Sequence, residues 1–253
     1  MTESSDHIPE TKLETPKRVH SWTWFFVEYG AIAFALLILL ALLLPNVRFA
    51  KEPARRVQCL NNLRYISLAV LNYSEQYGSL PPAYTVDALG KPLHSWRTLI
   101  LPFLDQEKLY KTIDLSKPWD DPANEVAFKT VVRAFQCPET ELPAGQTTFV
   151  AMASDDLCFH PTRGRALSEF KDGTNQTVMV LETDREHAVH WMSPNDCDPK
   201  WFLNFDAKSP LAHPGGINVA HVDGSARFFR ASTPAKTRAA LMTIAGGDKV
   251  EEY

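Results

Sequence analysis

The feature that most constrains this chain is a run of apolar residues from Trp22 to Leu44. The run contains one charged residue, Glu28, and one glycine, Gly30. As a helix it would be roughly 34 Å long, which is enough to cross a hydrocarbon core of roughly 30 Å. No small-residue cleavage site follows it, so we predict an uncleaved membrane anchor rather than a signal peptide. The alternative is an apolar hairpin inside a soluble core.

The predicted anchor divides the chain into three parts. Residues 1–21 are polar, carry charges of both signs and show no periodicity, so we expect a disordered tail. Residues 22–45 form the anchor, and residues 46–253 have the length of one folded domain. The formal net charge of −4 offers no basic surface for nucleic acid, which we exclude as a partner.

The charges in and around the anchor leave two questions open. A carboxylate in hydrocarbon is costly, so Glu28 either reaches the lipid headgroups or pairs when such helices associate. Basic residues flank both ends of the anchor, so charge alone does not decide its orientation. These residues are Lys12, Lys17 and Arg18 before the anchor, and Arg48, Lys51, Arg55 and Arg56 after it.

An amphipathic helix is predicted directly after the anchor. Its apolar stripe repeats every three or four residues, as one face of a helix does, and consists of Cys59, Leu63, Ile66, Val70, Tyr73 and Tyr77. Gly78 and the pair Pro81–Pro82 end the pattern. We therefore expect a long helix, half in lipid and half packed on a soluble domain.

The rest of the chain changes from short helices to strands. Helical segments are expected at Ser95–Leu104, Glu107–Ile113 and Asn124–Phe135, and strands at Thr147–Met152, Thr177–Leu181 and His187–Trp191. Asp223-Gly224 between Ile217–Val222 and Ser225–Phe229 predicts a hairpin with a type I′ turn. A last helix is expected from Thr233-Pro234 to Gly246. The fold class is α+β, with the long helix packed on an antiparallel sheet, short inserted helices and a C-terminal helix.

The four cysteines, Cys59, Cys137, Cys158 and Cys197, form no CxxC pair. An even number on a membrane-anchored domain favours disulfides outside the cytoplasm, and reduced buried thiols are the alternative. Three pairings are possible. We predict Cys59–Cys137, which would join the amphipathic helix to the globular part, and Cys158–Cys197 as the second pair.

Acidic residues and histidines are concentrated in the second half of the chain, so a divalent cation such as Ca²⁺ could find oxygen ligands there. The candidate ligands are Asp184, His213 and Asp223, although no spacing is diagnostic of a metal site. The structural alternative is that His213 caps a turn and Asp223 sets a hairpin. No nucleophile or nucleotide-binding motif is present, so we expect no enzyme and no cofactor beyond a possible Ca²⁺.

Several motifs together carry a resemblance to a known family. They are Glu28, Pro45, RRVQCLNNLR (residues 55–64), SWRTLILPFLDQEKLY (95–110), PWDDPAN (118–124), FQCP (135–138), KDGTNQTVMVLE (171–182) and HPGGINVAHVDGSARFF (213–229). This set resembles type IV pilin-like proteins and, more narrowly, the bacterial prepilin-like family catalogued as domain of unknown function 1559. The last motif contains that family's His-x9-Asp-Gly signature as His213, Asp223 and Gly224.

The resemblance implies a pilin-like fold and a place in the cell envelope, but no reaction. Pilin precursors have a glycine before the cleavage point, whereas counting back from Glu28 places Thr23 there and Trp24 first in the mature chain. We therefore expect an unprocessed, single-pass protein of the cytoplasmic (inner) membrane with its C-terminal domain outside the cytoplasm. Its expected role is structural or interactive, with lipid and other pilin-like subunits as partners. The alternative is a membrane-anchored module that binds a divalent cation or a carbohydrate.

Overall fold

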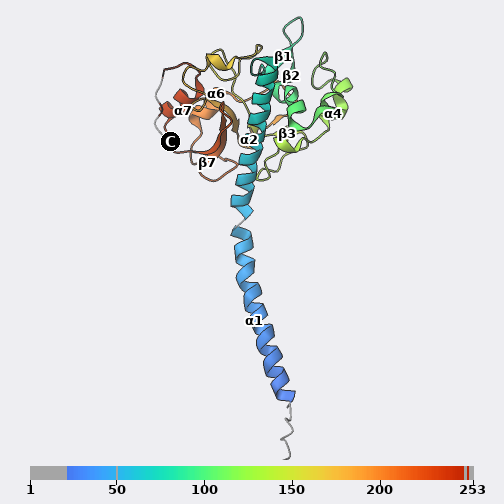
Figure 1. The fold of residues 1–253 in the computed structure, drawn as a ribbon, viewed down its shortest axis with the longest axis vertical. Helices are drawn as coiled ribbons and strands as arrows, with labels where there is room; N and C mark the ends of the chain where they lie inside the picture. The colour runs from blue at the N-terminus through green and yellow to red at the C-terminus, as the bar shows by residue number, and fades with distance from the viewer. Residues whose placement is uncertain (1–21, 50, 248–249, 251–253) are drawn as a thin grey trace, which may run out of the picture. The chain divides into compact units, whose positions relative to one another are not determined.

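The computed structural model describes residues 22–49, 51–247 and 250 (Figure 1). The expected disordered tail, residues 1–21, lies outside the described residues. The chain divides into two compact units, one ending at Ala50 and the other beginning at Lys51.

The first unit contains α1, which runs from Trp22 to Phe49. Its apolar segment Trp22–Leu42 is long enough to cross a membrane, and none of it is buried inside the protein. A core helix of a soluble protein would be covered, so the exposed α1 is compatible with a single membrane anchor or a signal sequence. Trp22, Trp24 and Tyr29 are exposed near its N-terminal end, where amphipathic rings prefer the membrane–water interface.

The second unit begins with α2 (Lys51–Tyr77), which is the predicted amphipathic helix. Most of its predicted stripe is completely buried, namely Cys59, Leu63, Ile66 and Val70. Tyr77 is exposed and contacts the ring of Tyr73 at the end of the helix. Gly78 then adopts a φ of 78° and donates its N–H to the carbonyl of Ser74, which ends α2 as expected.

A four-stranded antiparallel sheet packs against α2 (Figure 1). Its strands, in spatial order, are β4 (Phe149–Val150), β5 (Val178–Glu182), β7 (Gly216–His221) and β8 (Ala226–Arg230). The architecture is therefore α+β with an antiparallel sheet, as the periodicities predict. Consecutive residues of a strand point to opposite faces, and every residue of β5 and β7 is buried, so both faces of the sheet are covered there.

Each face of the sheet has its own apolar core. Val180 and Ala220 belong to the cluster that includes the buried stripe of α2. Their neighbours Leu181 and Val219 belong to a second cluster, together with residues of α6 (Pro199–Asn204) and α7 (Ala235–Met242). The domain thus has α2 on one face of the sheet and α6 with α7 on the other.

The hairpin between β7 and β8 forms where Asp223-Gly224 predicts it, but its turn is not type I′. Asp105 is the one non-glycine residue with positive φ in the described chain, so Asp223 lacks the conformation that a type I′ turn needs. Gly224 has a φ of 83°, and its N–H donates to the carbonyl of His221. The N–H of His221 in turn donates to the carbonyl of Ser225. This is a type I turn followed by a glycine bulge, which the same dipeptide also accommodates.

The short elements depart most from the expectations. The predicted strand Thr147–Met152 is divided between β3 (Gln146–Thr147), which pairs with β6 (Val189–His190), and β4 of the main sheet. The predicted helix Asn124–Phe135 is broken into η2 (Pro122–Asn124), α5 (Glu125–Phe128) and η3 (Arg133–Phe135). The remaining elements are β1 (Tyr84–Val86), β2 (Pro92–Ser95), α3 (Trp96–Leu99), η1 (Leu101–Leu104), α4 (Glu107–Tyr110) and η4 (Leu167–Glu169).

A buried ion pair fixes α3 to the loop before α6. The guanidinium of Arg97 is fully buried, and its Nη1 lies 2.7 Å from Oδ1 of Asp196. Its other nitrogens donate to the carbonyls of Asn195 and Trp191. The Asp196 carboxylate also accepts from the Ala151 N–H and from the Trp96 indole. All three guanidinium nitrogens of Arg97 and both carboxylate oxygens of Asp196 therefore have hydrogen-bond partners, which offsets the cost of burying two charges.

Candidate functional site: the buried disulfide cluster

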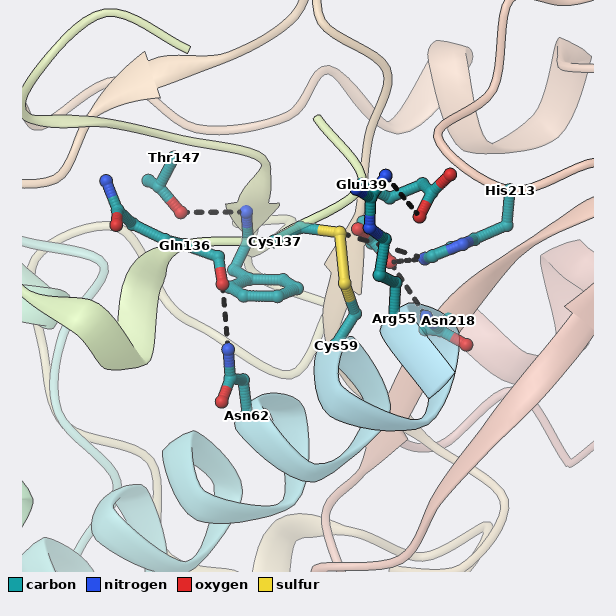
Figure 2. Close-up of a disulfide and its surroundings, with 11 residues drawn as sticks. Arg55, Cys59, Asn62, Gln136, Cys137, Glu139, Thr147, His213 and Asn218 are labelled. Atoms are coloured by element: carbon teal, nitrogen blue, oxygen red, sulfur yellow. Dashed lines mark hydrogen bonds and ion pairs between the residues drawn. A yellow bond between two sulfur atoms is a disulfide. The ribbon is translucent and has the colours of Figure 1, made fainter. Parts of the chain in front are cut away.

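The predicted disulfide between Cys59 and Cys137 is present (Figure 2). The two Cα atoms lie 5.1 Å apart and are separated by 78 positions in the sequence. Both cysteines are buried, Cys59 on the inner face of α2 and Cys137 just after η3. The Asn62 amide, one turn after Cys59, donates to the carbonyl of Gln136 over 2.7 Å. Side-chain and backbone contacts thus hold the segment around Cys137 against α2.

A second buried group lies next to the disulfide and consists of Glu182, His213 and Asn218. Glu182 is the last residue of β5, Asn218 lies on the neighbouring β7, and His213 precedes β7. Nε2 of His213 is 3.0 Å from Oε2 of Glu182, and the Asn218 amide donates to the same oxygen over 2.9 Å. Nε2 of His213 also lies 3.9 Å from Sγ of Cys137. Figure 2 shows His213 and Asn218 beside the disulfide.

The strand pattern explains why these side chains meet. Val180 faces the core beneath α2 and Leu181 faces away from it, so Glu182 returns to the α2 side. Asn218 stands on the same side because both of its neighbours on β7 face the other core. The buried polar residues therefore converge on Cys59.

The cluster keeps unused hydrogen-bonding capacity. Oε1 of Glu182 and Oδ1 of Asn218 are buried and have no hydrogen-bond partner among the described residues. Glu182 and Asn218 are themselves fully buried. A buried acceptor without a partner is costly, so these atoms mark a place where a ligand or a proton would be stabilised.

The candidate ligands predicted from the sequence do not form one site. Across the described residues, the ligand atoms close enough to hold a metal come from Cys59, Cys137, Glu182 and His213, all within 4.8 Å of one another. Of the three predicted ligands, only His213 belongs to this group. A set with two sulfurs and a single carboxylate also differs from the oxygen cage that Ca²⁺ requires.

Asp184 and Asp223 have other contacts. Oδ1 of Asp184 lies 2.7 Å from Nδ1 of His187, and its Oδ2 accepts from the Trp201 indole. Asp223 accepts from the N–H of Ser225 in the β7–β8 turn, which is the structural role considered for it as the alternative. The ring of His213 contacts the carboxylate of Glu182. This contact differs from the turn cap that was the structural alternative for His213.

The predicted second disulfide, Cys158–Cys197, is wrong. Both cysteines are free and buried. Cys158 belongs to the core beneath α2, whereas Cys197 belongs to the core on the other face of the sheet, so their side chains do not face each other. Burial raises the pKa of both thiols, which keeps them protonated and unreactive.

Glu182 is the important residue of this cluster that sequence reasoning did not single out. It is one of many acidic residues in the second half of the chain, but it directly follows the four apolar residues that make up the rest of β5. A charged residue continuing a buried strand is a sign of a buried pair, because an unpaired carboxylate would be too costly there.

The fold and the cluster define an α+β domain closed by one disulfide, in a chain that also carries an exposed apolar helix. A family model described as a protein of unknown function (DUF1559) matches residues 48–152, which supports the assignment of this chain to that family. The matched segment contains both cysteines of the disulfide. No significant match was found among curated proteins or among solved structures.

Proposed function

We propose that this chain is a single-pass protein of the cytoplasmic membrane that holds a pilin-like domain outside the cytoplasm in a structural or interaction role. The observation that carries the proposal is α1, whose segment Trp22–Leu42 is apolar and entirely uncovered. Lipid is the solvent that removes such a surface from water. The role is proposed to be structural or interactive, because the sequence motifs resemble those of pilin-like proteins.

The disulfide supports the proposed compartment. Disulfides persist in oxidising compartments and are uncommon in the cytosol, and Cys59–Cys137 joins residues 78 positions apart. An extracytoplasmic domain would keep this bond without further protection. The orientation proposed here therefore depends on the disulfide rather than on the flanking basic residues.

The proposed partners of α1 are lipid and other pilin-like subunits. Glu28 is exposed on this helix, so it is free to reach the headgroups or to pair with a neighbouring helix. Thr23 takes the place of the glycine that a prepilin peptidase requires, so we propose that the chain keeps its N-terminal segment.

Alkaline carbonate extraction tests the anchor. We expect full-length protein to stay in the membrane pellet after carbonate washing and to need detergent for release, because α1 is held by hydrophobic burial rather than by charge. In a matched control, Leu36, Leu37 and Leu40 are all replaced with arginine. Each arginine costs about 2.5–3.5 kcal/mol at the centre of a spanning helix, so this variant should not be held in the membrane. Release of the unaltered full-length protein by carbonate would overturn the proposal.

A further inference from the structure

We propose that the disulfide cluster is a redox-gated metal site: when Cys59–Cys137 is reduced, the two thiolates, His213 and Glu182 bind one Zn²⁺-like ion. The disulfide form excludes the metal, because its sulfur atoms are bonded to each other.

Two thiolates, an imidazole and a carboxylate are donors that Zn²⁺ accepts in proteins. Zinc binds cysteine sulfur at about 2.3 Å, histidine nitrogen at about 2.0–2.1 Å and carboxylate oxygen at about 2.0–2.2 Å, usually in a tetrahedron. Ligand atoms of such a tetrahedron are roughly 3.3–3.8 Å apart. The four ligand atoms here already lie within 4.8 Å of one another, and Sγ of Cys137 is 3.9 Å from Nε2 of His213. Small side-chain movements would complete the tetrahedron.

The surrounding polar atoms favour a cation. The contact between Nε2 of His213 and Oε2 of Glu182 is the place where a proton now bridges two ligand atoms, and a metal ion would replace that proton. Oε1 of Glu182 is buried and unused by the described residues, so the carboxylate has a second oxygen to offer. The Asn218 amide would hold Glu182 in place from the second coordination sphere, as outer-shell partners of metal ligands do.

Opening the site requires a two-electron reductant of the disulfide, and we propose a small thiol for this role. Two equivalents of a small thiol would convert the disulfide into two cysteine thiols and would themselves be oxidised to one disulfide. The metal would then displace both thiol protons to the buffer. When the metal binds, Nε2 of His213 loses the proton that it shares with Glu182. From a charged ring this proton leaves to the buffer, and in a neutral ring it shifts to Nδ1. A surface cavity of about 680 Å³, lined by Gln58, Arg133 and Cys137 among others, lies on the Cys137 side and would admit such a reductant.

Cobalt titration of the full-length chain in detergent micelles tests the proposal. After reduction with a phosphine, which offers no thiolate to compete, Co²⁺ is expected to give the sulfur-to-metal charge-transfer band and the strong visible bands of a tetrahedral site. The oxidised chain is expected to give neither. Zn²⁺ should remove the bands. The double variant Cys158→Ala/Cys197→Ala should keep them, whereas His213→Asn should weaken Co²⁺ binding by at least about tenfold.

X-ray absorption of the reduced, zinc-loaded wild-type chain gives a readout that does not depend on any variant folding. We expect two sulfur and two nitrogen or oxygen ligands. A shell of four sulfurs, a shell without sulfur, or no bound metal after reduction would overturn the proposal, as would an unchanged affinity of His213→Asn for Co²⁺.

Discussion

Replacing both Cys59 and Cys137 with alanine is expected to lower the free energy of unfolding by about 4.5 kcal/mol, the chain-entropy value for a loop of this length. The bond joins α2 to the segment after η3 across 78 positions, so its loss releases a long loop in the unfolded chain. The measurement is urea unfolding of the full-length protein in micelles, followed by near-ultraviolet circular dichroism.

The control for this prediction is Cys158→Ala, which removes a buried sulfur from the same core without opening a loop. It is expected to cost about 1 kcal/mol. If the free energy of unfolding of the double cysteine variant lies within about 1 kcal/mol of the wild-type value, the disulfide is not the main constraint on the position of α2.

Asp196→Ala is expected to cost about 3–5 kcal/mol, because it leaves the guanidinium of Arg97 buried without its counter-charge. Arg97 is fully buried, and the Ala151 N–H and the Trp96 indole would lose their acceptor as well. Burial raises the pKa of the Asp196 carboxyl, whereas the charge of Arg97 and the hydrogen bonds from Ala151, Arg97 and Trp96 oppose that rise.

A double variant that removes both charges separates the cost of the unpaired charge from the other contributions. Arg97→Met with Asp196→Leu is expected to cost less than Asp196→Ala alone, because no unpaired charge is left behind. Glu107→Ala, which breaks the exposed Glu107–Lys111 pair, should change stability little. A loss for Asp196→Ala as small as that for Glu107→Ala would show that water reaches Arg97 in the folded chain.

The elements that could be predicted from sequence are those with a signal spread over many residues or with a distinctive turn. A continuous apolar run predicts α1, an apolar stripe at helical spacing predicts α2, and Asp223-Gly224 between two strand-like segments predicts the β7–β8 hairpin. The break between β3 and β4 could not be predicted. Both segments are strand-forming, and only the partners β6 and β5, far along the chain, decide which sheet each joins.

The candidate site was predicted in part for the same physical reason. Cys59 lay on a recognisable apolar stripe, so a bond from it to Cys137 could be proposed. The positions of Cys158 and Cys197 on opposite faces of the sheet depend on tertiary packing. The pairing of Glu182 with His213 depends on β5 and β7 being neighbours, which no local pattern in either segment indicates.

A pair of reporter fusions after Tyr253 tests the central claim most directly. A phosphatase that is active only outside the cytoplasm is expected to be active when fused there, and a β-galactosidase that is active only in the cytoplasm is expected to be silent. The opposite pattern would place the disulfide-closed domain in the cytoplasm and contradict the proposed function.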